Sequence, residues 1–189
     1  MTVLVVYASR HGATRGIAER IAATLSAAGQ RADVHPSDEV RDLSGYDAFV
    51  IGAAIYYGHW RKPAAAFVQR NMALLIKRPV WLFSSGPLGS QTPDAQGHRP
   101  PEADPPRELG ELREAVRSRG ERVFYGALDP AGLTLPERTL RRVPAGRALL
   151  PEGDFRNWAD IDAWAQEIAH ELSEPKTRAL KPEGAPLTG

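Results

Sequence analysis

The sequence predicts a three-layer α/β domain in which a five-stranded parallel sheet, in the order 2-1-3-4-5, carries helices on both faces. Two observations lead to this fold class. Short apolar runs alternate with helical patterns five times along the chain, and such alternation is typical of a parallel sheet that is covered on both faces. The first apolar run, Val3–Tyr7, leads through a polar, glycine-containing turn into a helical pattern. This places a ligand-binding turn after the first strand, where the strand order reverses.

Five runs have the length and composition of buried strands. Val3–Tyr7 is apolar throughout, rich in β-branched residues and too short for a helix, as expected of a strand that is buried on both faces. The second run alternates between polar and apolar residues, so we expect it at an edge of the sheet. The predicted strands are residues 3–7, 31–35, 47–52, 79–84 and 122–128.

Apolar residues at helical spacing mark the segments between these strands. Gly29 is a common signal for the end of a helix, and Pro63 suits the first helical position. The predicted helices are residues 12–28, 39–43, 63–75, 107–119 and 157–172. Two proline-containing segments, 86–106 and 129–153, are expected to be long loops. Loops of this length in a compact domain are usually functional or disordered.

Length, charge and composition exclude several classes of protein. The 189 residues fit one domain, expected over residues 1–172, and a polar tail over residues 173–189 that is expected to be disordered. The net charge of +1 gives no reason to expect nucleic acid, and the absence of cysteine excludes disulfides and thiolate metal sites. We expect no metal site. No apolar run approaches the ~20 residues that span a bilayer, and the chain enters its first strand without room for a signal peptide, so a cytoplasmic protein is expected.

The turn after the first strand has the features of a phosphate-binding site. Its free N–H groups and the dipole of the following helix point at an anion. Ser9 and Thr14 can add hydroxyl donors, and Gly12 lets the backbone approach a phosphate closely. The glycine patterns of nucleoside-triphosphate and dinucleotide sites are missing. An ordinary capped helix is the alternative interpretation. The turn consists of Ser9, Arg10, His11, Gly12, Ala13 and Thr14.

Two more loops should meet this turn at the same edge of the sheet. Both combine small residues, whose backbone can reach the edge of a flat ring, with a glycine, and the first adds aromatic residues that can stack on the ring face. The alternative is that these aromatic side chains only cap the core. The loop after the third strand contains Ala54, Ile55, Tyr56, Tyr57 and Gly58, and the loop after the fourth contains Ser84, Ser85, Gly86, Pro87 and Leu88.

These segments resemble those of a known family. Ser-x-His-Gly-x-Thr, residues 9–14, resembles the phosphate loop of flavodoxins, which binds the monophosphate of FMN. Three segments are similar to the corresponding segments of menaquinone-dependent protoporphyrinogen IX dehydrogenases, a flavodoxin-like family of haem biosynthesis. They are residues 50–59, Val-Ile-Gly-Ala-x-Ile-Tyr-Tyr-Gly-His, residues Tyr7–Arg15, and the closing helix 158–170. The resemblance covers residues 2–172. It implies a flavodoxin-like fold, and FMN bound by all three loops.

The same resemblance implies an FMN-dependent oxidoreductase. Its substrate would give a hydride to N5 of the flavin, and the electrons would pass to a quinone or another acceptor. The long loops 86–106 and 129–153 both start at the ligand end of the sheet, so we expect at least one of them to cover the flavin and form a pocket for the substrate or quinone. His59 is the one ionisable side chain beside the ring-binding loop that is suited to proton transfer at neutral pH, so we predict it as a catalytic residue. Arg61, Arg138, Arg141 and Arg142 are candidates to meet substrate carboxylates.

Two other functions stay open at this point. The first is an electron-carrier flavodoxin that serves a redox partner protein and has no substrate of its own, although such carriers are typically strongly acidic and this chain is not. The second is a flavin-free interaction module, for which His11 in place of a hydroxyl residue is the support. A quinone acceptor would be compatible with weak peripheral contact at the inner face of the cell membrane. The sequence gives no indication of an oligomeric state.

Overall fold

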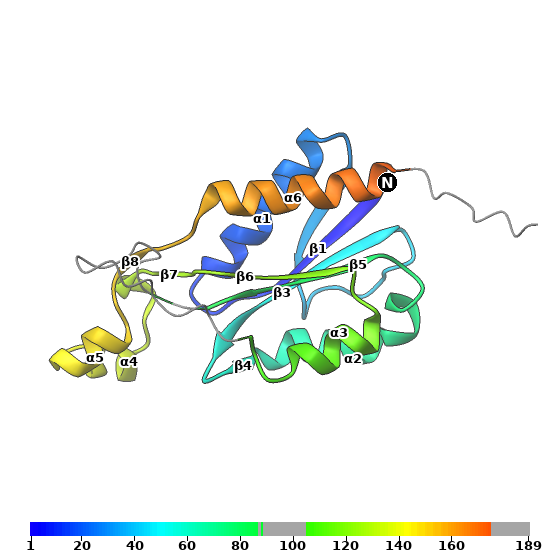
Figure 1. Cartoon of the computed structure of the whole chain (residues 1–189). Coiled ribbons are helices and arrows are strands. Elements are labelled where there is room, and N and C mark those ends of the chain that lie inside the picture. The colour runs from blue at the N-terminus through cyan, green and yellow to red at the C-terminus, as the bar shows by residue number, and fades with distance from the viewer. Residues whose placement is uncertain (87, 89–104, 175–189) are drawn as a thin grey trace, which may run out of the picture.

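The computed structural model describes residues 1–86, 88 and 105–174, and its main sheet has the predicted strand order. Five parallel strands pair in the order β2-β1-β3-β5-β6, which is 2-1-3-4-5 when only these five are counted (Figure 1). The strands are β1 (Thr2–Ala8), β2 (Arg31–Pro36), β3 (Ala48–Tyr56), β5 (Val80–Ser85) and β6 (Gly120–Phe124).

Helices cover both faces of this sheet, and each face has its own apolar core. α1 (Ala13–Ala27) and α6 (Trp158–Ser173) lie on one face, and α2 (Lys62–Leu75) and α3 (Leu109–Val116) lie on the other (Figure 1). Successive side chains of a strand point to opposite faces. Val3 and Val5 of β1 therefore join the core under α1 and α6, whereas Leu4 and Val6 join the core under α2 and α3.

The register of the sheet brings three turns together. Ala8 at the end of β1 pairs with Ala53 of β3, and Ala53 and Ala54 pair with Ser84 and Ser85 at the end of β5. Because the strands are parallel, the chain leaves β1, β3 and β5 at the same edge. The segments after these three strands therefore become neighbours, as the sequence predicted.

The predicted short helix at residues 39–43 is wrong. The chain forms a turn at residues 37–39 and continues without regular structure to residue 43. Ser44 donates its backbone N–H and its hydroxyl to the carboxylate of Asp42, so the side chain of Asp42 organises a local bend. Five residues would also form too few hydrogen bonds to offset the nucleation of a helix.

The third and fifth predicted strands end differently from the prediction. β3 continues to Tyr56 and turns back through β4 (His59–Trp60) as an antiparallel hairpin. β6 ends at Phe124, and the chain then leaves the main sheet. β7 (Ala127–Leu128) pairs instead with β8 (Gly153–Asp154) in a separate two-stranded sheet.

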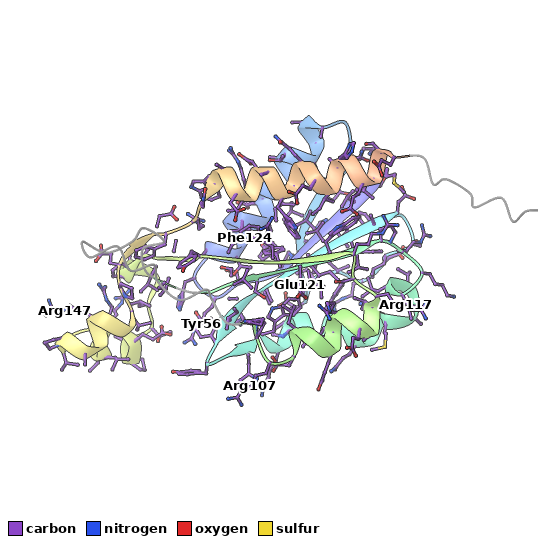
Figure 2. All side chains as sticks on the ribbon, in the orientation of Figure 1. Tyr56, Arg107, Arg117, Glu121, Phe124 and Arg147 are labelled. Atoms are coloured by element: carbon purple, nitrogen blue, oxygen red, sulfur yellow. The ribbon has the colours of Figure 1, made fainter. Side chains whose placement is uncertain are left out.

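The predicted loop at residues 129–153 contains short helices. We call residues 129–152 the arm. Prolines stand in the first turn of its three helices, where their fixed backbone angle suits helix entry. The helices are η1 (Pro130–Gly132), α4 (Leu135–Leu140) and α5 (Pro144–Leu149). α4 and α5 lie beyond the end of the sheet, at the lower left of Figure 1, and Figure 2 shows Arg147 there, remote from the main sheet.

The rest of the predicted loop regions lies largely outside the described residues. This applies to residue 87 and residues 89–104 of the loop 86–106, and to residues 175–189 of the tail. The predicted domain limit at residue 172 stays a prediction. Among the described residues, no helix has both the length and the apolar character that crossing a membrane requires.

Candidate functional site

A cavity of about 400 Å³ opens where β1, β3 and β5 end. Its volume is in the range of small-molecule sites, ~300–1,000 Å³. Four segments provide its walls: the turn after β1, the end of β3 with its hairpin, the residues after β5, and the arm with β7. The described lining residues are Ser9, Arg10, His11, Ala13, Thr14, Ala54, Ile55, Tyr56, Tyr57, Ser85, Gly86, Leu88, Gly126, Ala127, Leu128, Leu133, Glu137, Leu140 and Leu150.

Residues 9–14, which we call the phosphate turn, have the geometry of an anion cradle. Gly12 precedes α1 in the left-handed region, with φ 87°, a backbone conformation that glycine adopts without strain. Its N–H donates to Ser9 Oγ at 3.1 Å. No acidic residue occupies the first turn of α1, so no carboxylate competes there with an anion for the positive end of the helix dipole.

Thr14 provides a direct test of whether this turn fits a phosphate. The residue is 1% exposed, and its hydroxyl has no hydrogen-bond partner within the part of the chain that the structure describes. Buried polar atoms without a partner are uncommon, and this one lines the cavity at the start of α1. A bound phosphate oxygen would satisfy it, so the residues that are present fit the group.

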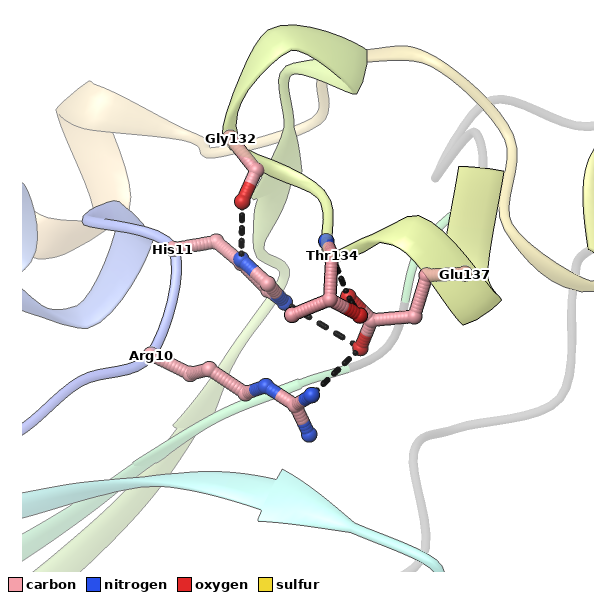
Figure 3. A network of polar contacts seen from close by, with 5 residues as sticks. All are labelled: Arg10, His11, Gly132, Thr134 and Glu137. Atoms are coloured by element: carbon pink, nitrogen blue, oxygen red, sulfur yellow. Dashed lines mark hydrogen bonds and ion pairs between the residues drawn. The ribbon is translucent and has the colours of Figure 1, made fainter. Parts of the chain in front are cut away.

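Arg10 and His11 of the phosphate turn contact the arm (Figure 3). The guanidinium of Arg10 lies 2.9 Å from Glu137 Oε1, His11 Nδ1 donates to the carbonyl of Gly132 at 3.1 Å, and His11 Nε2 lies 3.5 Å from Glu137 Oε1. The last distance is longer than that of an ordinary hydrogen bond, and His11 Nε2 has no hydrogen-bond partner among the described residues. Burial acts to raise the pKa of Glu137, but hydrogen bonds from Thr134 and the charges of Arg10 and His11 outweigh it and lower the pKa.

The hairpin that follows β3 forms another wall of the cavity. Tyr57 and Gly58 form its two-residue turn, and both have positive φ angles, 52° and 78°, as the right-handed twist of a tight hairpin requires. The side chain of Tyr57 is 95% exposed and lines the mouth of the cavity. Tyr56 is half-buried beneath the guanidinium of Arg10, 5.3 Å from its ring centroid, and burial raises the pKa of the Tyr56 phenol.

The structure does not bring His59 into the cavity. Because β3 continues to Tyr56, His59 falls on the returning strand β4. Its Nδ1 contacts Glu108 Oε1 at 2.5 Å, just before α3, and His59 is not among the described residues that line the cavity. The prediction of His59 as the catalytic residue therefore has no geometric support.

Other predicted residues have structural rather than lining positions. Ser84 is fully buried, and its Oγ accepts a hydrogen bond from the indole N–H of Trp60 at 2.7 Å. Gly12 and Gly58 shape their turns without lining the cavity. Pro87 lies outside the described residues. The arginines predicted to meet substrate carboxylates, Arg61, Arg138, Arg141 and Arg142, are not among the described lining residues either.

The sequence predicted that at least one of the two long loops would form part of a pocket, and the arm does line the cavity. It did not indicate which residues of the arm do so. Leu133, Leu140 and Leu150 give the cavity an apolar wall, and Glu137 adds a carboxylate. One local signal was present. Thr134 and Glu137 have the spacing of a capping box, and the backbone N–H and hydroxyl of Thr134 both donate to Glu137 Oε2, at 2.9 and 2.8 Å. That pattern predicts where α4 begins, but it does not say what the helix contacts.

Known proteins share both the sequence pattern and the fold. Residues 4–144 match the family described as "Flavodoxin domain". The protoporphyrinogen IX dehydrogenase [quinone] of Escherichia coli strain K12 is 25% identical over 187 residues, which cover 93% of this chain and 98% of that one.

Solved flavodoxins have the same fold. A flavodoxin from the domain Archaea superposes with a TM-score of 0.58 at 15% identity, covering 92% of this chain and all of the other. Flavodoxin 1 of Bacillus cereus gives a TM-score of 0.58 at 14% identity, with the same coverage. Because the matched family segment spans well over half of the sequence, the chain belongs to the flavodoxin domain family, whose cofactor is FMN.

Proposed function

We propose that this flavodoxin-like oxidoreductase has a substrate of its own and acts as a dehydrogenase of the protoporphyrinogen IX type, with a quinone as electron acceptor. The observation that carries the proposal is the apolar wall that the arm adds to the cavity, through Leu133, Leu140 and Leu150. A carrier that only exchanges electrons through the flavin edge has no need of a second wall. The Escherichia coli relative, similar over nearly its whole length, is itself named as a quinone-linked protoporphyrinogen IX dehydrogenase.

Three segments are arranged to hold FMN. The backbone N–H groups of the phosphate turn and the hydroxyl of Thr14 would take the phosphate. The backbone of Ala54–Tyr57 and of Ser85 and Gly86 would take the edge of the ring, and Tyr57, which lines the cavity and is exposed, would cover a ring face. Bound FMN supplies the redox chemistry by accepting a hydride from the substrate.

The arm's outer surface supports a proposed acceptor that dissolves in membranes. Leu135 and Val143 expose much of their side chains to solvent. Arginines 138, 141, 142 and 147 belong to the same short segment. Apolar side chains beside cations favour weak contact with an anionic lipid surface. We propose such peripheral contact as the route by which a quinone reaches the cavity.

The central experiment is anaerobic turnover by the purified, FMN-loaded protein. Protoporphyrinogen IX is supplied as the donor and a soluble menaquinone analogue as the acceptor, and porphyrin formation is followed by fluorescence. We expect saturable, FMN-dependent turnover. A protein that gives no turnover with any porphyrinogen or quinone, yet passes single electrons rapidly to a partner protein, would instead be a carrier.

Substitution of Thr14 tests the phosphate site. Thr14→Val keeps the shape of the side chain and removes its donor. Losing a hydrogen bond to a charged group costs about 1.5–3 kcal/mol, so the affinity for FMN should fall by roughly 10- to 100-fold, measured by quenching of flavin fluorescence. Thr24→Val, on the same helix but bonded to Asp162, is the matched control and should leave the affinity unchanged. Unchanged affinity in Thr14→Val would place the phosphate elsewhere.

A further inference from the structure

The two carboxylate oxygens of Glu137 contact different parts of the protein. Oε2 accepts both hydrogen bonds from Thr134 and so completes the first turn of α4. Oε1 faces away from the helix and contacts Arg10 and His11 of the phosphate turn (Figure 3). One side chain therefore joins the start of an arm helix to a turn that lies more than 120 residues earlier in the chain.

Both basic side chains of the phosphate turn contact the arm. Arg10 lies 2.9 Å from Glu137 and stacks over Tyr56. Each ring nitrogen of His11 faces an acceptor of the arm, Nδ1 the carbonyl of Gly132 and Nε2 the carboxylate of Glu137. The side chains of His11 and Glu137 are only 7% and 19% exposed, so water weakens these contacts less than it weakens surface pairs.

These contacts lie next to the apolar wall. Leu133, whose side chain is buried, lies between Gly132 and Thr134 in the sequence. Gly132 accepts the hydrogen bond of His11, and Thr134 donates to Glu137. Leu140 lies at the other end of α4. Holding Gly132 and Glu137 in place therefore holds both leucines at the cavity.

We propose that Glu137 is a positioning residue for the substrate side of the cavity. By contacting Arg10 and His11 it fixes the leucines of the arm as a wall, and it draws these two side chains away from the phosphate site. The proposal rests on the proposed function in that the wall serves a substrate. Loss of the Glu137 carboxylate should loosen the arm and leave the affinity for FMN unchanged or higher. General damage to the fold would loosen the arm and also lower the affinity for FMN.

Glu137→Gln separates the two tasks of this residue. The amide oxygen of glutamine can still accept from Thr134, as in other capping boxes, but its NH₂ group would face the donors of Arg10 and His11. We expect trypsin to cleave FMN-loaded Glu137→Gln at the arginines of the arm about tenfold faster than the native protein, as loss of a charge-assisted hydrogen bond predicts. The dissociation constant of FMN should stay equal or fall.

Two further variants keep the test decisive. Glu152→Gln removes an ion pair with Arg141 that lies within the arm, so its cleavage should match that of the native protein. Arg10→Gln breaks the same contact from the other side and should accelerate cleavage like Glu137→Gln. If Glu137→Gln fails to fold, Arg10→Gln alone decides. Unchanged cleavage in either variant, or an FMN affinity of Glu137→Gln that falls together with arm protection, would overturn the proposal.

Neither measurement requires a substrate, so a failure of the proposed function can be told from a failure of this inference. Where turnover is observed, Glu137→Gln should raise the KM for the substrate by about tenfold, with a smaller change in kcat. The reason is that a loosened wall weakens binding of the substrate in its ground state. An equal fall in kcat with no change in KM would assign Glu137 a direct role in the reaction and contradict a positioning role.

Discussion

The hairpin and the arm, two of the four segments around the cavity, each take part in a histidine–glutamate contact, but they are held by different forces. In the hairpin, Trp60 belongs to the core under α2 and α3 and bonds Ser84 of β5, whereas His59 and Glu108 are 48% and 34% exposed. In the arm, Leu133 is buried but belongs to neither main core, and the contact of His11 with Glu137 is largely shielded. The hairpin is therefore fixed by the main core, whereas the arm is fixed by polar contacts with the phosphate turn and by a buried leucine outside that core.

Truncating the apolar anchor of each wall should give the largest difference. Trp60→Ala opens the main core and should lower the free energy of global unfolding by about 3–5 kcal/mol, measured by chemical denaturation. Leu133→Ala removes a buried leucine, which costs about 2–5 kcal/mol, but this loss should fall on local opening of the arm. Hydrogen exchange of residues 129–152 would detect it while global unfolding changes little. Equal losses of global stability would show that the arm belongs to the main core.

Acid should open the arm before the hairpin. Contacts with neighbouring groups lower the pKa of both Glu137 and Glu108, although burial acts in the opposite direction. Such a carboxyl stabilises the protein above its unfolded pKa, ~4.3, and this contribution is lost as the pH falls through its folded pKa. Between pH 7 and pH 3, hydrogen-exchange protection should fall in residues 129–152 and persist in residues 53–60, which the core holds. Glu137→Gln should show weak arm protection at both pH values; an arm that keeps its protection in acid would contradict the comparison.

The smallest expected effect belongs to His59→Ala. A partly exposed ion pair contributes about 0.2–1 kcal/mol, so stability should change little, and turnover should change by less than about threefold. Loss of a general acid or base typically lowers the rate by about 100- to 10,000-fold, so steady-state kinetics distinguish a surface contact from a catalytic role. Glu108→Gln breaks the same contact and should behave like His59→Ala.

Local patterns were enough to predict most of the fold and half of the site. The strand order and the phosphate turn follow from apolar runs and from the strand–glycine–helix pattern around Gly12. The parallel register then places the segments after β3 and β5 beside that turn. Each of these features is encoded within one segment or follows from a general rule of parallel sheets.

The parts that escaped prediction depend on unusual local geometry or on distant partners. The hairpin after β3 has tyrosine, not asparagine or glycine, at its first left-handed position, so no turn signal indicated that His59 lies on a returning strand. The contact between His11 and Gly132 joins residues 121 positions apart. No periodicity in the sequence reports such a pairing, because it depends on where the arm packs after the sheet has formed.

The backbone conformation of Tyr57 makes the hairpin less stable than it would be with glycine at this position. A bulky residue in the left-handed region is less stable than glycine there by roughly 1–2 kcal/mol. The Tyr57 ring is almost completely exposed to water, so its packing within the protein offsets little of this strain. A turn selected for stability alone would carry glycine or asparagine at this position. The strained turn thus presents an aromatic surface at the mouth of the cavity. A bound planar molecule that packs on the Tyr57 ring would offset part of the strain energy.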